Sequence, residues 1–214
     1  MNPDRRTVLK AGLAAGSLFL PLPYAWVWAQ SEGAHQLLRA PKIALVIGNS
    51  AYRHTTVLNN PANDAKAIAS LLKSFGFDVT MKLDASRAEL ASNIQGHVEK
   101  LAENKGIGLF YFAGHGLQLA WRNYLVPVEA AIKKETDVPQ QCMEIGSLID
   151  GLNAAANPMN IIILDACRQN PFGNDFRDAN KGLSQMDAPP STLLAYATAP
   201  GNVASDGDGA RDAE

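Results

Sequence analysis

Apolar residues along this chain gather in short runs that alternate with longer segments of helical periodicity. Five runs are predicted to be strands, because they are short, rich in β-branched or aromatic residues and bounded by Gly, Pro or Asn. They cover residues 42–48, 77–83, 107–113, 160–165 and 193–198. Nearly continuous apolar strands of this kind are typical of a parallel sheet that is buried on both faces.

Three helices are predicted between these strands. The first begins at Asn60-Pro61, with Pro at the first helical position, and ends before Gly76. The sequence Ser86-Arg-Ala-Glu89 is a capping box that opens a second helix to about residue 104, and a third covers about 144–156. Because strands and helices alternate, we expect an α/β protein, a three-layer α/β/α sandwich around a mainly parallel sheet.

Two of the strands end on reactive side chains. The apolar run 106–116 reaches His115, and the run 159–168 reaches Cys167. Ligands bind in the crevice outside the carboxyl ends of parallel strands, so both residues are expected at one edge. An imidazole can take the thiol proton, and the thiolate is a nucleophile. Taken singly, His115 could be a hydrogen-bonded histidine in a Gly turn and Cys167 an inert thiol.

The residues around this pair resemble a known family. Ala166-Cys167-Arg168, with a histidine 52 positions upstream, resembles the caspase signature, in which the His lies about 50 residues before the Cys. Asp165 stands where caspases have Gln. An acid at this position, together with Phe112-Ala-Gly-His-Gly116 and Ala44-Leu-Val-Ile-Gly-Asn-Ser-Ala-Tyr52, is a combination that resembles the bacterial metacaspase-like (orthocaspase) branch of peptidase family C14. The resemblance covers roughly residues 42–206.

The resemblance implies a caspase-like fold and a cysteine endopeptidase with a Cys167–His115 dyad. It also implies that the N–H groups of Gly116 and Cys167 form the oxyanion hole. In the metacaspase-like family, the acids that match Asp64 and Asp165 line the S1 pocket and select Arg or Lys before the scissile bond. Strand alternation independently places Asp165 on the face of Cys167. For Asp64, a favourable position in the helix dipole is the alternative.

The segment 169–190 holds Asn, Gly, Asp and Pro with few periodic apolar residues, and is predicted to be a connection. In caspase relatives the linker between the large and small subunits lies about here and is often cut. Arg177 and Lys181 are therefore candidate self-cleavage sites, and ordinary solvated charges in a loop are an alternative of at least equal weight.

Composition narrows the choice of function. A formal net charge of −2 over 214 residues gives no sign of a nucleic-acid partner. Two cysteines cannot make a disulfide scaffold, so Cys142 is expected to be a small buried hydrophobe, with a regulatory disulfide as the minor alternative. No cofactor is expected. Calcium activation is not favoured, because Trp121-Arg122-Asn123 stands where calcium-activated relatives carry an acid.

The predicted boundaries are a signal segment over 1–29, a linker over 30–41, the caspase-like peptidase domain over 42–206 and a tail over 207–214. Asp4-Arg5-Arg6-Thr7-Val8-Leu9-Lys10 resembles a twin-arginine export motif ahead of an apolar stretch over 11–20. The protein is therefore expected in the periplasm or outside a bacterial cell, with an uncleaved anchor as the alternative.

The sequence stops at Glu214, soon after the fifth expected strand, where relatives continue into the small subunit. We therefore expect the C-terminal part of the fold to be missing. We also expect the chain to self-associate or to need a small-subunit segment, because an open sheet edge can pair with another strand. The alternative to a peptidase that acts on proteins or peptides with a basic P1 residue is a weakly active or inactive caspase-like scaffold. An esterase is disfavoured because no Gly-x-Ser-x-Gly appears.

Replacing Arg5 and Arg6 together with Lys is expected to keep the precursor inside the cell, because export signals of this kind are read by a receptor that recognises the arginine pair. Cell fractionation and immunoblotting measure the distribution. Unchanged export of the double variant would contradict the prediction.

Overall fold

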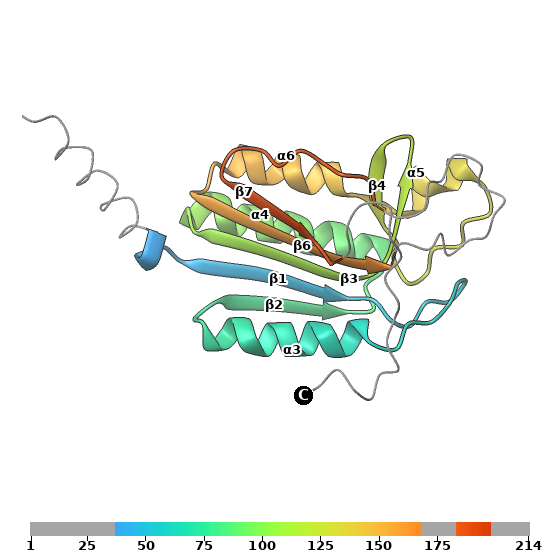
Figure 1. Ribbon diagram of the computed structural model, residues 1–214, viewed down its shortest axis with the longest axis horizontal. Coiled ribbons are helices and arrows are strands. Elements are labelled where there is room, and N and C mark those ends of the chain that lie inside the picture. Colours follow the sequence, from blue (N-terminus) through green and yellow to red (C-terminus); the bar gives the residue numbers. More distant parts are fainter. Residues whose placement is uncertain (1–36, 168–182, 198–214) are drawn as a thin grey trace, which may run out of the picture. The chain divides into compact units, whose positions relative to one another are not determined.

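The computed structural model describes residues 37–167 and 183–197, and the elements below belong to the body that begins at Ala40. Its centre is a parallel sheet in the order β2-β1-β3-β6-β7 (Figure 1). The strands are β1 (Lys42–Gly48), β2 (Asp78–Leu83), β3 (Ile107–Leu119), β6 (Met159–Cys167) and β7 (Thr192–Tyr196). The predicted parallel sheet is confirmed.

Helices cover both faces of this sheet. On one face, α3 (Pro61–Ser74) packs against alternate side chains of β1 and β3, among them Val46 and Tyr111. On the other face, α4 (Arg87–Asn104) and α6 (Ile145–Ala155) pack against the intervening residues, among them Leu45 and Phe110. This arrangement is the three-layer sandwich that the alternating pattern predicts. Among the described residues, no helix is both long and apolar enough to span a membrane.

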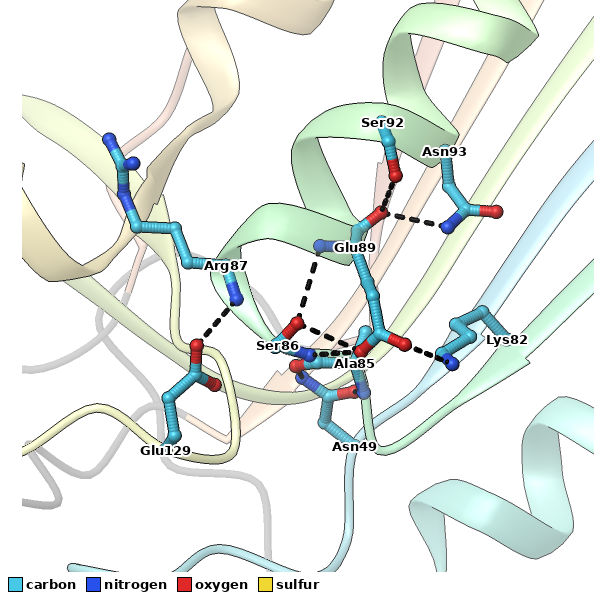
Figure 2. A network of polar contacts seen from close by, with 9 residues as sticks. All are labelled: Asn49, Lys82, Ala85, Ser86, Arg87, Glu89, Ser92, Asn93 and Glu129. Atoms are coloured by element: carbon cyan, nitrogen blue, oxygen red, sulfur yellow. Dashed lines mark hydrogen bonds and ion pairs between the residues drawn. The ribbon is translucent and has the colours of Figure 1, made fainter.

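The start of α4 is fixed by the predicted capping box (Figure 2). Ser86 Oγ accepts from the Glu89 N–H, and Glu89 Oε2 accepts from the Ser86 N–H at 2.9 Å. Lys82 near the end of β2 donates to Glu89 Oε1 at 2.5 Å. This hydrogen bond, and next the one from the Ser86 N–H, lower the pKa of Glu89 to about 2. Just before the cap, the Ala85 N–H donates to Asn49 Oδ1 at 2.8 Å. The helix is thereby tied to the ends of β1 and β2.

The strand predicted over 107–113 is longer than expected. After Ala113 the chain continues as strand through His115 to Leu119, turns at Ala120 and Trp121, and returns as β4 (Arg122–Leu125), which pairs antiparallel with β3. The glycines around His115 therefore belong to the strand and do not form a turn. At Gly114, φ is +152°, a conformation that glycine permits and that lets the strand change its pairing partner.

Smaller elements complete the region beyond β4. They are a 3₁₀ turn (Glu135–Asp137), α5 (Val138–Gln141) and β5 (Met143–Glu144). Val138 of α5 belongs to an apolar cluster with Tyr52, Tyr124 and Val126, and Cys142 lies in this cluster with 2% of its surface exposed. Asn60 precedes α3 as predicted, but its side chain makes no capping hydrogen bond; its backbone carbonyl accepts from Asn63 and Asp64.

His97 of α4 generates a prediction about acid stability. Its side chain is 5% exposed, and burial, followed by the charge of Lys100, lowers its pKa from 6.5 to about 4. Below pH 6.5 the unfolded chain therefore takes up a proton that the folded chain excludes. The free energy of unfolding should fall by up to about 3 kcal/mol as the pH drops from 6.5 to 4.

Urea unfolding of wild type and His97→Leu at pH 7 and pH 4.5 checks this. The variant should lose clearly less stability than wild type over this interval, since leucine has no proton to gain. Identical losses in the two proteins would show that His97 does not govern the acid response.

Candidate active site

His115 and Cys167 lie side by side on adjacent parallel strands. The register of β3 and β6 pairs His115 with Cys167, and this is the last pair at the carboxyl end of the two strands. Neighbouring strands are about 4.8 Å apart, so the two backbones are within reach of a shared substrate. The two residues thus meet at one sheet edge, as the strand pattern predicts.

The imidazole of His115 is oriented by the segment 49–60, which connects β1 to α3. His115 Nε2 lies 2.8 Å from the backbone carbonyl oxygen of Thr56. A carbonyl oxygen can only accept, so Nε2 carries the proton and Nδ1 holds the lone pair of the neutral ring. The ring of Tyr52 packs against the imidazole, with centroids 4.4 Å apart at an angle of 51°. The side chain of His115 is buried, with 4% of its surface exposed.

Gly116 follows His115 at a crowded point. A Cβ atom here would lie 2.9 Å from the Cβ atom of Ala166 and 3.0 Å from Leu183 Cδ2, so the position excludes larger residues. The His115 carbonyl accepts from the Val126 N–H at 3.0 Å, which makes this a hydrogen-bonded pair of the antiparallel ladder. Successive residues of a strand direct their N–H groups to opposite edges. The Gly116 N–H therefore faces the edge along which β6 runs.

Two carboxylates lie near Tyr111, on the sheet face that α3 covers. The Tyr111 hydroxyl donates to Asp165 Oδ2 at 3.1 Å. Burial raises the pKa of Tyr111, and the nearby charges of Asp165 and Asp64 raise it further. The two acids predicted for the S1 pocket therefore both act on one phenol, Asp165 from β6 and Asp64 from the first turn of α3.

Sequence reasoning missed Tyr111 and Thr56 as parts of this site. Tyr111 could have been found, because it lies two residues before Ala113, which pairs with Asp165 in the register of β3 and β6. It therefore shares a sheet face with that acid. Thr56 contributes a backbone carbonyl, which any residue type can supply, so the sequence carries no signal for it.

The thiol of Cys142 is buried among apolar side chains. Burial raises the pKa of Cys142 to about 12, so this thiol stays protonated near neutral pH and is a poor nucleophile. It is the buried hydrophobe that the sequence predicts. The candidate self-cleavage residues Arg177 and Lys181 lie outside the described residues.

Comparison with known proteins gives the family. The family model described as Caspase domain (Peptidase_C14) matches residues 41–212. The chain therefore belongs to the caspase-domain family, whose members are cysteine peptidases that act on proteins.

Curated relatives are similar over the same region. The chain is 29% identical over 173 residues to the human mucosa-associated lymphoid tissue lymphoma translocation protein 1, and 28% identical over 171 residues to its mouse homolog. These alignments cover 80% and 79% of this chain but 20% of each relative, so the chain spans about a fifth of their length. A crystal structure of a Geobacter sulfurreducens protein matches with a TM-score of 0.45 and 20% identity, over 59% of this chain and 51% of that one.

Proposed function

We propose that this protein is a cysteine endopeptidase of the metacaspase-like type that cleaves after Arg or Lys. The observation that carries the proposal is the strand register, which sets Cys167 beside a histidine whose Nε2 is committed to the Thr56 carbonyl. In this tautomer the ring proton is on Nε2, and Nδ1 carries the lone pair that can accept a proton. That is the property required of the general base in a thiol dyad.

The reaction would proceed in two halves. His115 Nδ1 takes the proton of Cys167, and the thiolate attacks the peptide carbonyl carbon, moving an electron pair onto its oxygen. The N–H groups of Gly116 and Cys167 stabilise this oxyanion. The His115 imidazolium then protonates the departing amine as the C–N bond breaks, which leaves a thioester. A water molecule, deprotonated by His115, attacks the thioester and regenerates the thiol.

Specificity for a basic residue would come from the acids around Tyr111. Asp165 and Asp64 offer carboxylate oxygens to a guanidinium or ammonium group, and hydrogen bonds between such charged partners are about twice as strong as neutral ones. The Tyr111 hydroxyl orients the Asp165 carboxylate through its 3.1 Å hydrogen bond. The same negative charge would repel the acidic side chain that true caspases accept.

The dyad is tested by Cys167→Ala and His115→Ala on reporter peptides that end in Arg or Lys. Each change is expected to lower turnover by at least about a thousandfold, because the nucleophile or its base is gone. The matched control is Cys142→Ala, which removes the other thiol and should retain turnover. Substantial turnover by Cys167→Ala, or its loss in Cys142→Ala, would show that Cys167 is not the nucleophile. A wild-type protein that binds such peptides without cleaving them would favour a scaffold.

The specificity pocket is tested by Asp165→Asn, which removes one negative charge. The kcat/KM for Arg-ended peptides should fall roughly thirtyfold more than the kcat/KM for peptides ending in a neutral residue. This corresponds to a loss of about 2 kcal/mol of transition-state stabilisation. Asp150→Asn, on the exposed surface of α6, makes the same change in net charge and should leave both rates unaltered. Equal losses on the two peptides would mean that Asp165 only supports the strand.

A further inference from the structure

The antiparallel ladder between β3 and β4 is incomplete at His115. In a hydrogen-bonded antiparallel pair, two residues exchange two N–H···O=C bonds. The His115 carbonyl accepts from the Val126 N–H at 3.0 Å, which is one of them. The His115 N–H, however, donates to the hydroxyl of Tyr52 at 2.7 Å. That hydroxyl in turn donates to the Val126 carbonyl at 3.3 Å. The Tyr52 hydroxyl therefore replaces the second ladder bond.

Gly114 makes room for this hydroxyl. A Cβ atom at position 114 would lie 2.6 Å from the Tyr52 hydroxyl oxygen, closer than the two atoms can approach. The φ of +152° at Gly114 is also a conformation that other residues rarely adopt. The Tyr52 hydroxyl can therefore reach the backbone of His115 only because Gly114 has no side chain.

Tyr52 is itself held firmly. Its side chain is 5% exposed. The two residues before it, Ser50 and Ala51, each donate a backbone N–H to Asp84 Oδ1 at 2.8 Å. Asn49 donates its backbone N–H to Ala113 at 2.9 Å and its side chain to the Val126 carbonyl at 3.2 Å. The Tyr52 hydroxyl is therefore positioned by a segment that is hydrogen-bonded to β3 and to the residues that directly follow β2 and β4.

We propose that Tyr52 is a positioning residue for His115. Its hydroxyl fixes the backbone amide of His115, and its ring, with its centroid 4.4 Å from that of the imidazole, supports one face of the side chain. Tyr52 has no part in the bond-making and bond-breaking steps proposed above, and it acts through His115. The proposal rests on the function proposed above, in which His115 is the base for Cys167. The proposal adds Tyr52 as the residue that fixes the position of this base.

The kinetic consequence follows from this indirect role. A displacement of about 1 Å in a catalytic group can cost on the order of a hundredfold in rate. Removing the hydroxyl leaves the His115 N–H and the Val126 carbonyl without the group that links them. The acids that would bind the substrate lie on other elements. The loss is therefore expected in kcat, with KM nearly unchanged.

The test compares Tyr52→Phe with wild type. We expect kcat to fall by about ten- to a hundredfold and KM to stay within about twofold. Alkylation of Cys167 by iodoacetamide should slow as well, and Cys142 will not interfere because its thiol is buried and protonated. Hydrogen exchange followed by NMR gives a readout that does not depend on activity. The His115 amide should exchange faster in the variant, while the β1 amides keep their protection.

The matched control is Tyr196→Phe on β7. It removes a phenol hydroxyl that donates to the backbone carbonyl of Ser184 at 3.2 Å. It should change neither kcat nor the exchange of the His115 amide. If Tyr52→Phe folds, as judged by its NMR spectrum, and keeps wild-type kcat or wild-type exchange at His115, the positioning role is overturned. Equal losses of kcat in Tyr52→Phe and Tyr196→Phe also overturn it.

Failure of the proposed function would look different. Wild-type protein would then be inactive, or Cys167→Ala would retain turnover, while exchange at the His115 amide would still report whether the Tyr52 hydroxyl holds it. The dyad variants therefore test the chemistry, and the exchange measurement tests the contact. A wild-type His115 amide that exchanges as fast as an exposed one overturns the proposal even in an inactive protein.

Discussion

The site depends on the change of pairing partner that β3 makes at Gly114 and His115. Up to Ala113, β3 pairs with β1; beyond it, the same edge is taken by β4. Buried backbone groups that lose their partners cost free energy, so the junction must be closed by other groups. The Tyr52 hydroxyl and the Asn49 side chain close it, both bonding to the Val126 carbonyl. The side chain of His115 is thereby held at the point where β3 changes its pairing partner.

The connection between β1 and α3 organises more of the site than its length suggests. It supplies the Tyr52 hydroxyl to the backbone of His115 and the Thr56 carbonyl to the imidazole. It then leads into α3, whose first turn carries Asp64. The proposed base is therefore fixed by this segment, and one proposed specificity residue lies on the helix that follows it. The anchoring of this segment on Asp84 ties their relative positions to the end of β2.

Local features could be predicted from the sequence wherever the residue types at a given spacing favour one geometry. Ser86 and Glu89 form the capping box that their spacing indicates, and the register brings His115 to Cys167 at the end of the sheet. The β3–β4 hairpin was not predicted. Its turn is formed by Ala120 and Trp121, at φ of +48° and +65°, where Gly or Asn is usual. The Thr56 contact was also beyond prediction, because it is made by a backbone carbonyl.

In the proposed pocket, the electrostatics of Tyr111 connect burial with specificity. Burial and two nearby carboxylates raise its pKa, so the phenol keeps its proton and remains a donor to Asp165 throughout the neutral range. A phenol can satisfy a lone pair of a carboxylate, but it is uncharged and leaves the carboxylate its negative charge. In the proposed pocket, a guanidinium or ammonium group would form a charge-assisted hydrogen bond with that carboxylate, whereas a neutral side chain would not. The Tyr111 hydroxyl would therefore fix the direction of the Asp165 carboxylate without removing the charge on which a preference for a basic residue depends.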